Sequence, residues 1–263
     1  MYIEADDFKF HENEVNRIAK AISSYIDLKD KVVLNIGAGQ GMHLSFLQKL
    51  SPQYVYETDV VNYHKLYDGH FVHLIVEKHE RNGHKIDLEK ASFITTSAMD
   101  LIFKDNMFDF IVSINAFEHI PKPEEALSET IRCLKHGGYA YITLDPIYYA
   151  DTGGHMFPFI PEPWGHLVYS KNEYVSKLRE ANASDSDIND FLYGLNRYKL
   201  DDFRKIFKTS EKKKEIKILQ WNRGLGVEDP NHKRHPNFDK LKKVYSKEDL
   251  LTRTLCVLFK KIE

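Results

Sequence analysis

The sequence has little cysteine and no long apolar run, and each shortage excludes a class of protein. Cys133 and Cys256 are the two cysteines among 263 residues, too few for a disulfide framework and without the spacing of a cysteine metal site. No stretch approaches the roughly 20 apolar residues that span a bilayer. Met1 to Phe10 contain three acidic residues and no apolar run, unlike a signal peptide. We therefore expect a cytoplasmic chain with no membrane partner.

The chain also lacks a large net charge, which is -2 at neutral pH and gives no general reason to expect nucleic acid. The charge is uneven, because residues 197–263 hold 19 Lys and Arg against 10 Asp and Glu. Such a region can face an anionic substrate, or it can be a solvated lysine-rich surface. We expect a small-molecule partner, with phosphorylated compounds included, rather than nucleic acid. The sequence indicates no oligomeric state.

Apolar runs alternate with amphipathic stretches through the first half of the chain. Runs rich in apolar and β-branched residues predict five strands, at 31–36, 54–60, 91–96, 108–114 and 139–144. Helical spacing predicts helices at 11–26, 42–50, within 62–90 and at 123–134. Because strands and helices alternate, the pattern predicts an α/β fold whose parallel sheet carries helices on both faces.

The alternation stops after residue 146, where proline, glycine and aromatic residues become frequent. Three short helices are predicted, at 171–181, 185–195 and 199–208. We interpret residues 147–212 as a helical and loop insertion between strands five and six that forms a lid over the substrate. Residues 213–263 are expected to add the last two strands. They complete a doubly wound, mostly parallel seven-stranded sheet whose core is residues 1–146.

A glycine-rich loop, Gly37-Ala38-Gly39-Gln40-Gly41, follows the first predicted strand. Glycines let the backbone turn sharply and approach a ligand closely. Dinucleotide-binding enzymes use a related G-x-G-x-x-G loop, but here the third glycine comes one residue earlier. Parallel sheets bind ligands at the carboxyl ends of their strands. The loop therefore predicts a ligand site at that edge of the sheet.

The G-x-G-x-G spacing resembles the first motif of the Rossmann-like class I S-adenosylmethionine (SAM)-dependent methyltransferases. Four further segments extend the resemblance: Asp59 at the end of the second strand, residues 97–103 after the third, residues 105–120 around the fourth, and residues 134–139 before the fifth. The run Phe117-Glu118-His119-Ile120 is similar to the signature of the small-molecule branch. The resemblance covers about residues 30–146 and implies a transferase that uses SAM.

The resemblance also implies which residues hold the cofactor. Asp59 would accept both ribose hydroxyls, and residues 97–99 would lie along the adenine. The implied cofactor-binding residues are Asn35, Gly37, Ala38, Gly39, Gly41, Asp59, Val60, Ser97, Ala98, Met99 and Asn115. Two of them depart from the family pattern, which usually has Asp or Glu at the position of Asn35 and often Asp at that of Ser97. Both keep a hydrogen-bonding group but lose the charge, which implies weaker cofactor binding.

Three histidines are candidates for catalysis, which requires an aligned acceptor and, for a hydroxyl acceptor, a base. His119 follows the fourth strand and is either the base or a residue that packs the next helix. His155 and His166 lie in the loop after the fifth strand and could be a base, substrate donors or metal ligands. They could equally belong to a rigid lid in which they hydrogen-bond the backbone. Tyr148, Tyr149 and Trp164 are candidate substrate-binding residues, and no metal site is assigned.

These features favour O-methylation of a small polar or anionic metabolite, such as a sugar nucleotide or another precursor of a surface polysaccharide. This would be a carbohydrate modification of the kind used in capsule biosynthesis. The alternatives are an RNA or protein methyltransferase, supported by the basic C-terminal region, and a non-catalytic SAM-fold binding protein, supported by Asn35 and Ser97.

Overall fold

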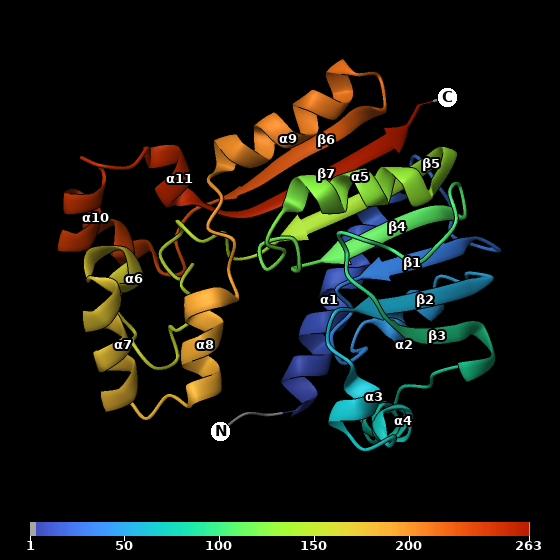
Figure 1. The fold of residues 1–263 in the computed structure, drawn as a ribbon, viewed down its shortest axis with the longest axis horizontal. Coiled ribbons are helices and arrows are strands. Elements are labelled where there is room, and N and C mark those ends of the chain that lie inside the picture. Colours follow the sequence, from blue (N-terminus) through green and yellow to red (C-terminus); the bar gives the residue numbers. More distant parts are fainter. Residues whose placement is uncertain (1–3, 263) are drawn as a thin grey trace.

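Seven strands form one sheet in the computed structural model, which describes residues 4–262 (Figure 1). The strands are β1 (Val32–Ile36), β2 (Tyr54–Asp59), β3 (Ala91–Thr95), β4 (Phe108–Ile114), β5 (Leu134–Leu144), β6 (Ile216–Leu225) and β7 (Thr252–Lys261). Their order is β3-β2-β1-β4-β5-β7-β6. The first five pair in parallel, whereas β7 runs antiparallel to both β5 and β6. The predicted α/β fold with a mostly parallel seven-stranded sheet is confirmed. Residues 1–3 of the N-terminal segment Met1 to Phe10, which is unlike a signal peptide in sequence, lie outside the described residues.

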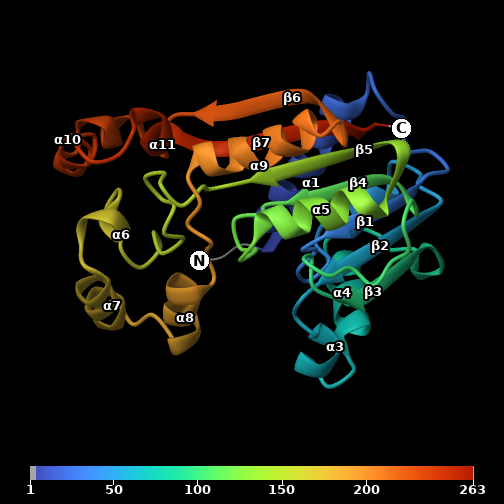
Figure 2. The same ribbon diagram turned by 45° about the horizontal axis from the view of Figure 1, so that its top comes forward.

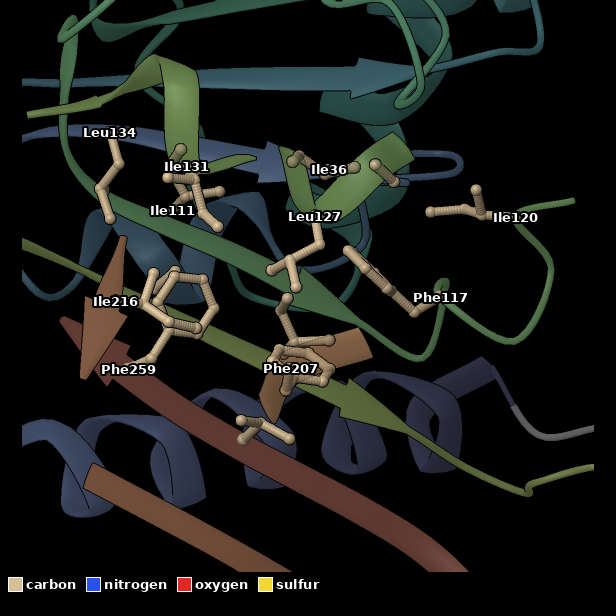
Figure 3. Packing of buried hydrophobic residues seen from close by; sticks show 14 of the residues in the cluster. Ile36, Ile111, Phe117, Ile120, Leu127, Ile131, Leu134, Phe207, Ile216 and Phe259 are labelled. Carbon is tan, nitrogen blue, oxygen red and sulfur yellow. The ribbon is translucent and has the colours of Figure 1, made fainter. Parts of the chain in front are cut away.

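Helices cover both faces of this sheet, because neighbouring residues of each strand point to opposite sides. One face packs against α5 (Pro123–Cys133) and α9 (Leu200–Lys212) through Leu127, Phe203 and Phe207. Figure 3 shows Leu127 and Phe207 in this cluster. The other packs against α1 (Glu4–Ile22) and α2 (Leu44–Gln48) through Ile18 and Leu47. The remaining helical turns before β4 are α3 (Tyr63–Leu66), α4 (Phe71–Arg81) and the 3-10 turn η1 (Leu88–Lys90).

The lid stands beyond the carboxyl ends of the parallel strands (Figures 1 and 2). It contains α6 (Gly165–Val168), α7 (Lys171–Glu180) and α8 (Asp185–Tyr193). Ser170 and Ser184 begin α7 and α8 as capping boxes with Glu173 and Asp187. The lid has an apolar cluster of its own, formed by Met156, Ile160, Tyr174, Leu178, Ile188 and Phe191. It is therefore a small packed layer rather than an open loop.

The boundaries of the lid differ from the predicted insertion at residues 147–212. Helix α9 falls inside that range but lies on the sheet, because Leu200, Phe203 and Phe207 form an apolar stripe that α5 and β6 cover. Conversely, residues 226–251 between β6 and β7 lie beside the lid rather than on the sheet. They contain η2 (Pro230–Arg234), α10 (Pro236–Leu241) and α11 (Lys247–Leu251). Leu241 and Leu250 from this segment pack on Trp164 of the lid.

Among residues 4–262, no helix combines the length and the apolar character that crossing a bilayer would require.

Candidate cofactor and substrate site

A cavity of ≈ 770 Å³ lies between the carboxyl ends of the parallel strands and the lid. This volume falls in the range of about 300–1,000 Å³ that small-molecule sites occupy. Nine of the candidate site residues predicted from the sequence line the cavity: Gly37, Asp59, Val60, Ser97, Ala98, Met99, Asn115, His119 and His155. The lid contributes Met156, Asp187, Asp190, Gly194 and Leu195. The predicted cofactor segments and one predicted lid histidine therefore meet at one site.

Gly37 brings the glycine loop to the wall of this cavity, in a turn that a side chain would prevent. Gly37 has a φ of +72°, and a Cβ atom there would lie 2.3 Å from the Cβ of Ala116. The amides of Gly37 and Ala38 both donate to the carbonyl of Thr58, at 2.8 and 2.9 Å. Gly39 has a φ of +57° with open space where its Cβ would be. The loop is therefore bound to β2 and leaves room for a ligand to approach the backbone.

Asp59 ends β2 with its carboxylate held in place by the backbone. Its Oδ2 accepts from the amide of Gly39 at 2.9 Å, and its Oδ1 accepts from the amide of Val61 at 2.8 Å. Each carboxylate oxygen can accept two hydrogen bonds, so each keeps one acceptor position. Because Asp59 lines the cavity, these positions suit two neighbouring hydroxyl groups such as those of a ribose.

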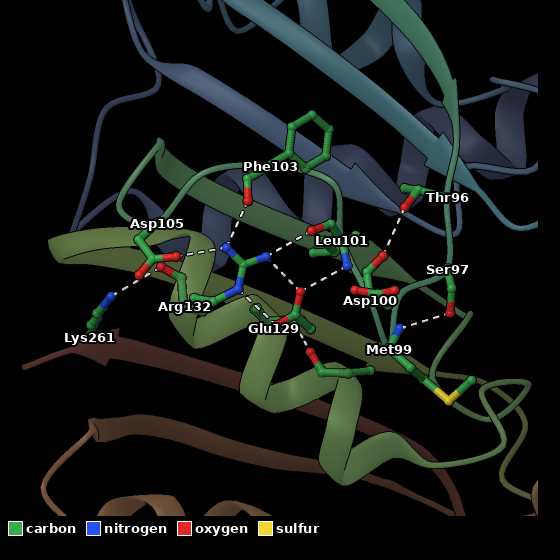
Figure 4. A network of polar contacts seen from close by, with 12 residues as sticks. Thr96, Ser97, Met99, Asp100, Leu101, Phe103, Asp105, Glu129, Arg132 and Lys261 are labelled. Atoms are coloured by element: carbon green, nitrogen blue, oxygen red, sulfur yellow. Dashed lines mark hydrogen bonds and ion pairs between the residues drawn. The ribbon is translucent and has the colours of Figure 1, made fainter.

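The segment after β3 forms a tight turn along the cavity wall (Figure 4). The hydroxyl of Ser97 accepts from the amide of Met99 at 3.1 Å, and the hydroxyl of Thr96 donates to the carbonyl of Asp100 at 3.1 Å. Ser97 thus uses an acceptor position to stabilise the turn and keeps its proton to donate to a ligand. An aspartate at position 97 would have no such proton.

Arg132 of α5 anchors the chain behind this turn (Figure 4). Its guanidinium donates to the carbonyls of Leu101 and Phe103 at 2.8 and 2.7 Å. Glu129, paired with Arg132 at 2.6 Å, accepts from the amide of Leu101 at 2.8 Å. Charge-assisted bonds of this kind are stronger than neutral ones. The wall that residues 97–99 present to the cavity is therefore held from the helix side.

Asn35 does not line the cavity, although the resemblance places it at the methionine end of the cofactor. Its amide donates to Oε2 of Glu57 on the neighbouring strand at 3.1 Å, and both residues are 1% exposed. Burial raises the pKa of Glu57 to about 8, and the bond from Asn35 offsets this only in part. A neutral Asn35 thus faces a carboxyl group that burial keeps protonated at pH 7. Ala38, Gly39 and Gly41 also lie outside the wall of the large cavity.

Asn115 lines the cavity but commits its polar atoms to neighbouring protein groups. Its side-chain amide donates to Oε1 of Glu14 on α1 at 2.5 Å, and its Oδ1 accepts from the hydroxyl of Thr143 at 2.9 Å. Asn115 therefore joins α1 to the carboxyl ends of β4 and β5.

His119 lines the cavity and has one ring nitrogen that can accept a proton. Its Nδ1 donates to the carbonyl of Gly194 at the end of α8, at 2.8 Å. A neutral imidazole with its proton on Nδ1 has Nε2 free to accept one. Within residues 4–262, no hydrogen bond engages that Nε2. His119 is therefore the candidate base that the geometry favours.

Asn196, at the end of the lid, holds the turn that carries His119 through hydrogen bonds. The side-chain amide of Asn196 donates to the carbonyls of Phe117 and Ile120, at 2.7 and 2.8 Å. Its backbone amide donates to the carbonyl of Glu118 at 2.9 Å. The end of the lid and the turn that carries His119 are thus fixed to each other.

The two lid histidines both bind the backbone. Nε2 of His155 contacts the carbonyl of Pro146 at 3.0 Å, and Nε2 of His166 contacts that of Tyr148 at 2.7 Å. Burial lowers the pKa of each histidine to about 4, against the opposing effect of these bonds. His155 reaches the cavity wall, whereas His166 does not. This is the arrangement of a rigid lid, one of the alternatives that the sequence left open.

The predicted substrate-binding aromatic residues lie outside the cavity wall. Trp164 is fully buried against Leu241 and Leu250. Tyr148 packs against His166, with ring centroids 5.0 Å apart, and Tyr149 packs against its neighbour Tyr148. The structure instead brings Asp187 and Asp190 of α8 to the wall, which the sequence reasoning missed. Their helical spacing of three was the available signal, but nothing local shows which way α8 faces.

Glu118 is the second buried carboxyl group near the cavity, and it makes stability dependent on pH. It is 2% exposed and accepts from the amide of Asp145 at 3.0 Å. Burial raises its pKa from 4.5 to about 8, with the Asp145 and Glu14 charges acting in the same direction and backbone hydrogen bonds opposing. The folded chain therefore binds a proton at pH 7 that the unfolded chain lacks.

We expect Glu118→Gln to gain stability relative to the native chain as pH rises from 4.5 to 8. In this window the native chain loses folding free energy, because only its folded state holds the extra proton, and glutamine has no such proton to lose. The difference in unfolding free energy should change by up to about 1.4 kcal/mol per pH unit. Urea unfolding of both proteins at pH 5, 6.5 and 8 measures it. Parallel pH profiles would contradict the expectation.

Part of the chain that carries this site is similar to known proteins. Residues 34–142 match the family model described as a methyltransferase domain. An uncharacterized methyltransferase of Mycobacterium avium is 27% identical over 113 residues, which cover 39% of this chain and 44% of that protein. The chain thus matches less than half the length of this relative.

Two solved structures share the fold over nearly the whole chain. A protein of Galdieria sulphuraria, named as a proposed sarcosine dimethylglycine methyltransferase, has a TM-score of 0.56 and 17% identity over 94% of this chain and 85% of its own. A protein of Bacillus halodurans, named as a proposed methyltransferase, has a TM-score of 0.55 and 16% identity over 94% of this chain and 100% of its own.

Proposed function

Because this chain contains a class I SAM-dependent methyltransferase domain, we propose that it methylates a hydroxyl group of a small polar acceptor. The family and cofactor predicted from the sequence are confirmed for this domain. The observation that carries the proposal is a single cavity whose wall contains Gly37 of the glycine loop, Asp59 and His119.

The residues present fit SAM. Gly37 allows a turn that a side chain would prevent by clashing with Ala116, Gly39 has open space beside its backbone, Asp59 keeps an acceptor position on each oxygen, and Ser97 keeps a proton to donate. The glycine loop, Asp59 and Ser97 would hold the methionine end, the ribose and the adenine, respectively. When bound, SAM supplies an electrophilic methyl group. The protein aligns the acceptor, and the lid excludes water.

His119 would accept the proton of the acceptor hydroxyl at Nε2. Its Nδ1 proton is held by the carbonyl of Gly194, which sets the tautomer and the orientation of the ring. A correctly placed general base contributes about 10²–10⁴-fold to rate. His155, packed edge-on against His119 with ring centroids 5.1 Å apart, would support the orientation of the ring.

The charges of the wall favour an acceptor rich in hydroxyl groups. Among the described residues that line the cavity, Asp59, Asp187 and Asp190 are acidic and none is Lys or Arg. The basic residues of 197–263 thus do not reach this wall, which removes the support for an anionic acceptor held by them. Carboxylates accept hydrogen bonds from sugar hydroxyls. We therefore favour an unphosphorylated sugar or polyol, of the kind used in carbohydrate modification, over a sugar nucleotide.

The test is methyl transfer from radiolabelled SAM to a panel of acceptors, with the purified chain. The panel contains free sugars and polyols, sugar nucleotides, bulk tRNA and peptides. We expect label in the free sugars or polyols. Label confined to tRNA or peptides would overturn the proposed acceptor class, and failure to bind SAM at hundreds of micromolar in calorimetry would overturn the proposed activity.

A further inference from the structure

Three side chains with metal-binding atoms meet on the α1 side of the sheet, outside the cavity wall. His11 and Glu14 lie one turn apart on α1, and His43 precedes α2. Nδ1 of His11 lies 3.0 Å from Oε2 of Glu14, and Nε2 of His43 lies 2.9 Å from the same oxygen. The two ring nitrogens are 3.0 Å apart. The three atoms therefore form a nearly equilateral triangle.

No single arrangement of protons makes all three of these contacts favourable hydrogen bonds. A ring nitrogen of histidine is either a donor or an acceptor, and an ionised carboxylate oxygen is an acceptor. If both ring nitrogens donate to Glu14, two N–H groups face each other across 3.0 Å. If one of them accepts from the other, it has no proton for Glu14. A cation at the centre would satisfy all three atoms as electron-pair donors.

We propose that His11, Glu14 and His43 form a binding site for a divalent transition-metal ion, with Zn²⁺ as the best-suited ion. Two imidazoles and one carboxylate are a ligand set that zinc accepts, with bonds of about 2.0–2.2 Å. A tetrahedral centre with such bonds separates its ligand atoms by about 3.3 Å. The observed triangle needs to widen by only a few tenths of an ångström to reach this spacing.

The surroundings of the cluster suit a metal site. The side chains of His11, Glu14 and His43 are 18%, 9% and 10% exposed, so an ion would be sheltered but accessible. The second oxygen of Glu14 accepts from the amide of Asn115 at 2.5 Å. Bonds of this kind from outside the ligand set orient the ligands of metal sites. The metal would bind α1 to α2 and, through Asn115, to the wall of the cofactor cavity.

The experiment uses the full chain, stripped of metal with EDTA and titrated with Zn²⁺ against a chromophoric chelator. We expect uptake of one Zn²⁺ per chain at micromolar protein. His43→Ala and Glu14→Gln should weaken Zn²⁺ binding by roughly a hundredfold or more, because loss of even an outer partner costs about 10–100-fold. Asn115→Ala should show that smaller loss. His73→Ala removes an exposed imidazole of α4 as the matched control and should bind as the native chain does.

Native-chain affinity in both His43→Ala and Glu14→Gln, or no uptake by the native chain, would overturn the site. X-ray absorption of the zinc-loaded native chain keeps the proposal testable if the variants fail to fold. It should show nitrogen and oxygen neighbours at about 2.0–2.2 Å with two imidazoles. Sulfur neighbours, or fewer than two imidazoles, would equally overturn it. The proposal is independent of the acceptor class, and none of these measurements requires methyl transfer.

Discussion

His119→Asn is expected to lower kcat by roughly 10²–10⁴-fold while SAM affinity stays near that of the native chain. Asparagine can keep the donor that His119 directs at the carbonyl of Gly194, but it has no group in the position of the imidazole Nε2. The variant therefore separates the loss of a proton acceptor from the loss of a packing contact. Steady-state turnover with the acceptor identified in the panel, together with calorimetry of SAM binding, measures both quantities.

The control is His70→Asn, which alters an exposed histidine that makes no side-chain cap on α4. It should leave kcat and SAM affinity unchanged. If His119→Asn turns over at the native rate, His119 is not the base. If its SAM affinity falls together with kcat, the residue supports the cofactor site rather than the proton transfer.

Asp59→Ala is expected to weaken SAM binding by about 1–3 kcal/mol, or roughly 5- to 150-fold in Kd, because the ribose hydroxyls lose a charged acceptor. Asp59→Asn should have a Kd for SAM between those of the native chain and Asp59→Ala, since it keeps one acceptor oxygen and loses the charge. Calorimetric titration with SAM gives the three dissociation constants. An unchanged Kd for Asp59→Ala would contradict the assignment of the ribose site.

Asp59 also accepts from the amides of Gly39 and Val61, so its removal can loosen the glycine loop itself. Urea unfolding of each variant, measured without SAM, distinguishes this effect from a lost ribose contact. Asp239→Ala on α10 removes a carboxylate that is 65% exposed and lies outside the cavity wall. It should match the native chain in SAM affinity.

The part of the site that could be predicted lies on the parallel strands. Gly37, Asp59, Ser97 and His119 each lie at the carboxyl end of a strand or just beyond it, and carboxyl ends of parallel strands meet at one edge whatever the details of packing. Their positions relative to the predicted strands were therefore enough to predict that they lie close together. The strands themselves could also be predicted, because each is a local run of apolar residues.

The rest depended on packing between distant segments. Trp164 was predicted to bind substrate from its position in the loop after the fifth strand, but it packs between the lid and residues 226–251. Asp187 and Asp190 face the cavity because the lid's own apolar cluster sets the rotation of α8. His11 and Glu14 are neighbours on a helix and visible in sequence, whereas His43 joins them only because α1 docks against the sheet. No local pattern encodes such docking.

The two halves of the sheet, one of which ends in the antiparallel hairpin of β6 and β7, carry segments with different proposed roles. The lid leaves from β5, and residues 226–251 leave from the hairpin of β6 and β7 and pack on the lid, so both attach to the same half of the sheet. The groups proposed to hold the nucleoside follow β1, β2 and β3, on the opposite half. Related chains could thus change their acceptor through changes in one half of the sheet, while the half proposed to bind the methyl donor stays the same.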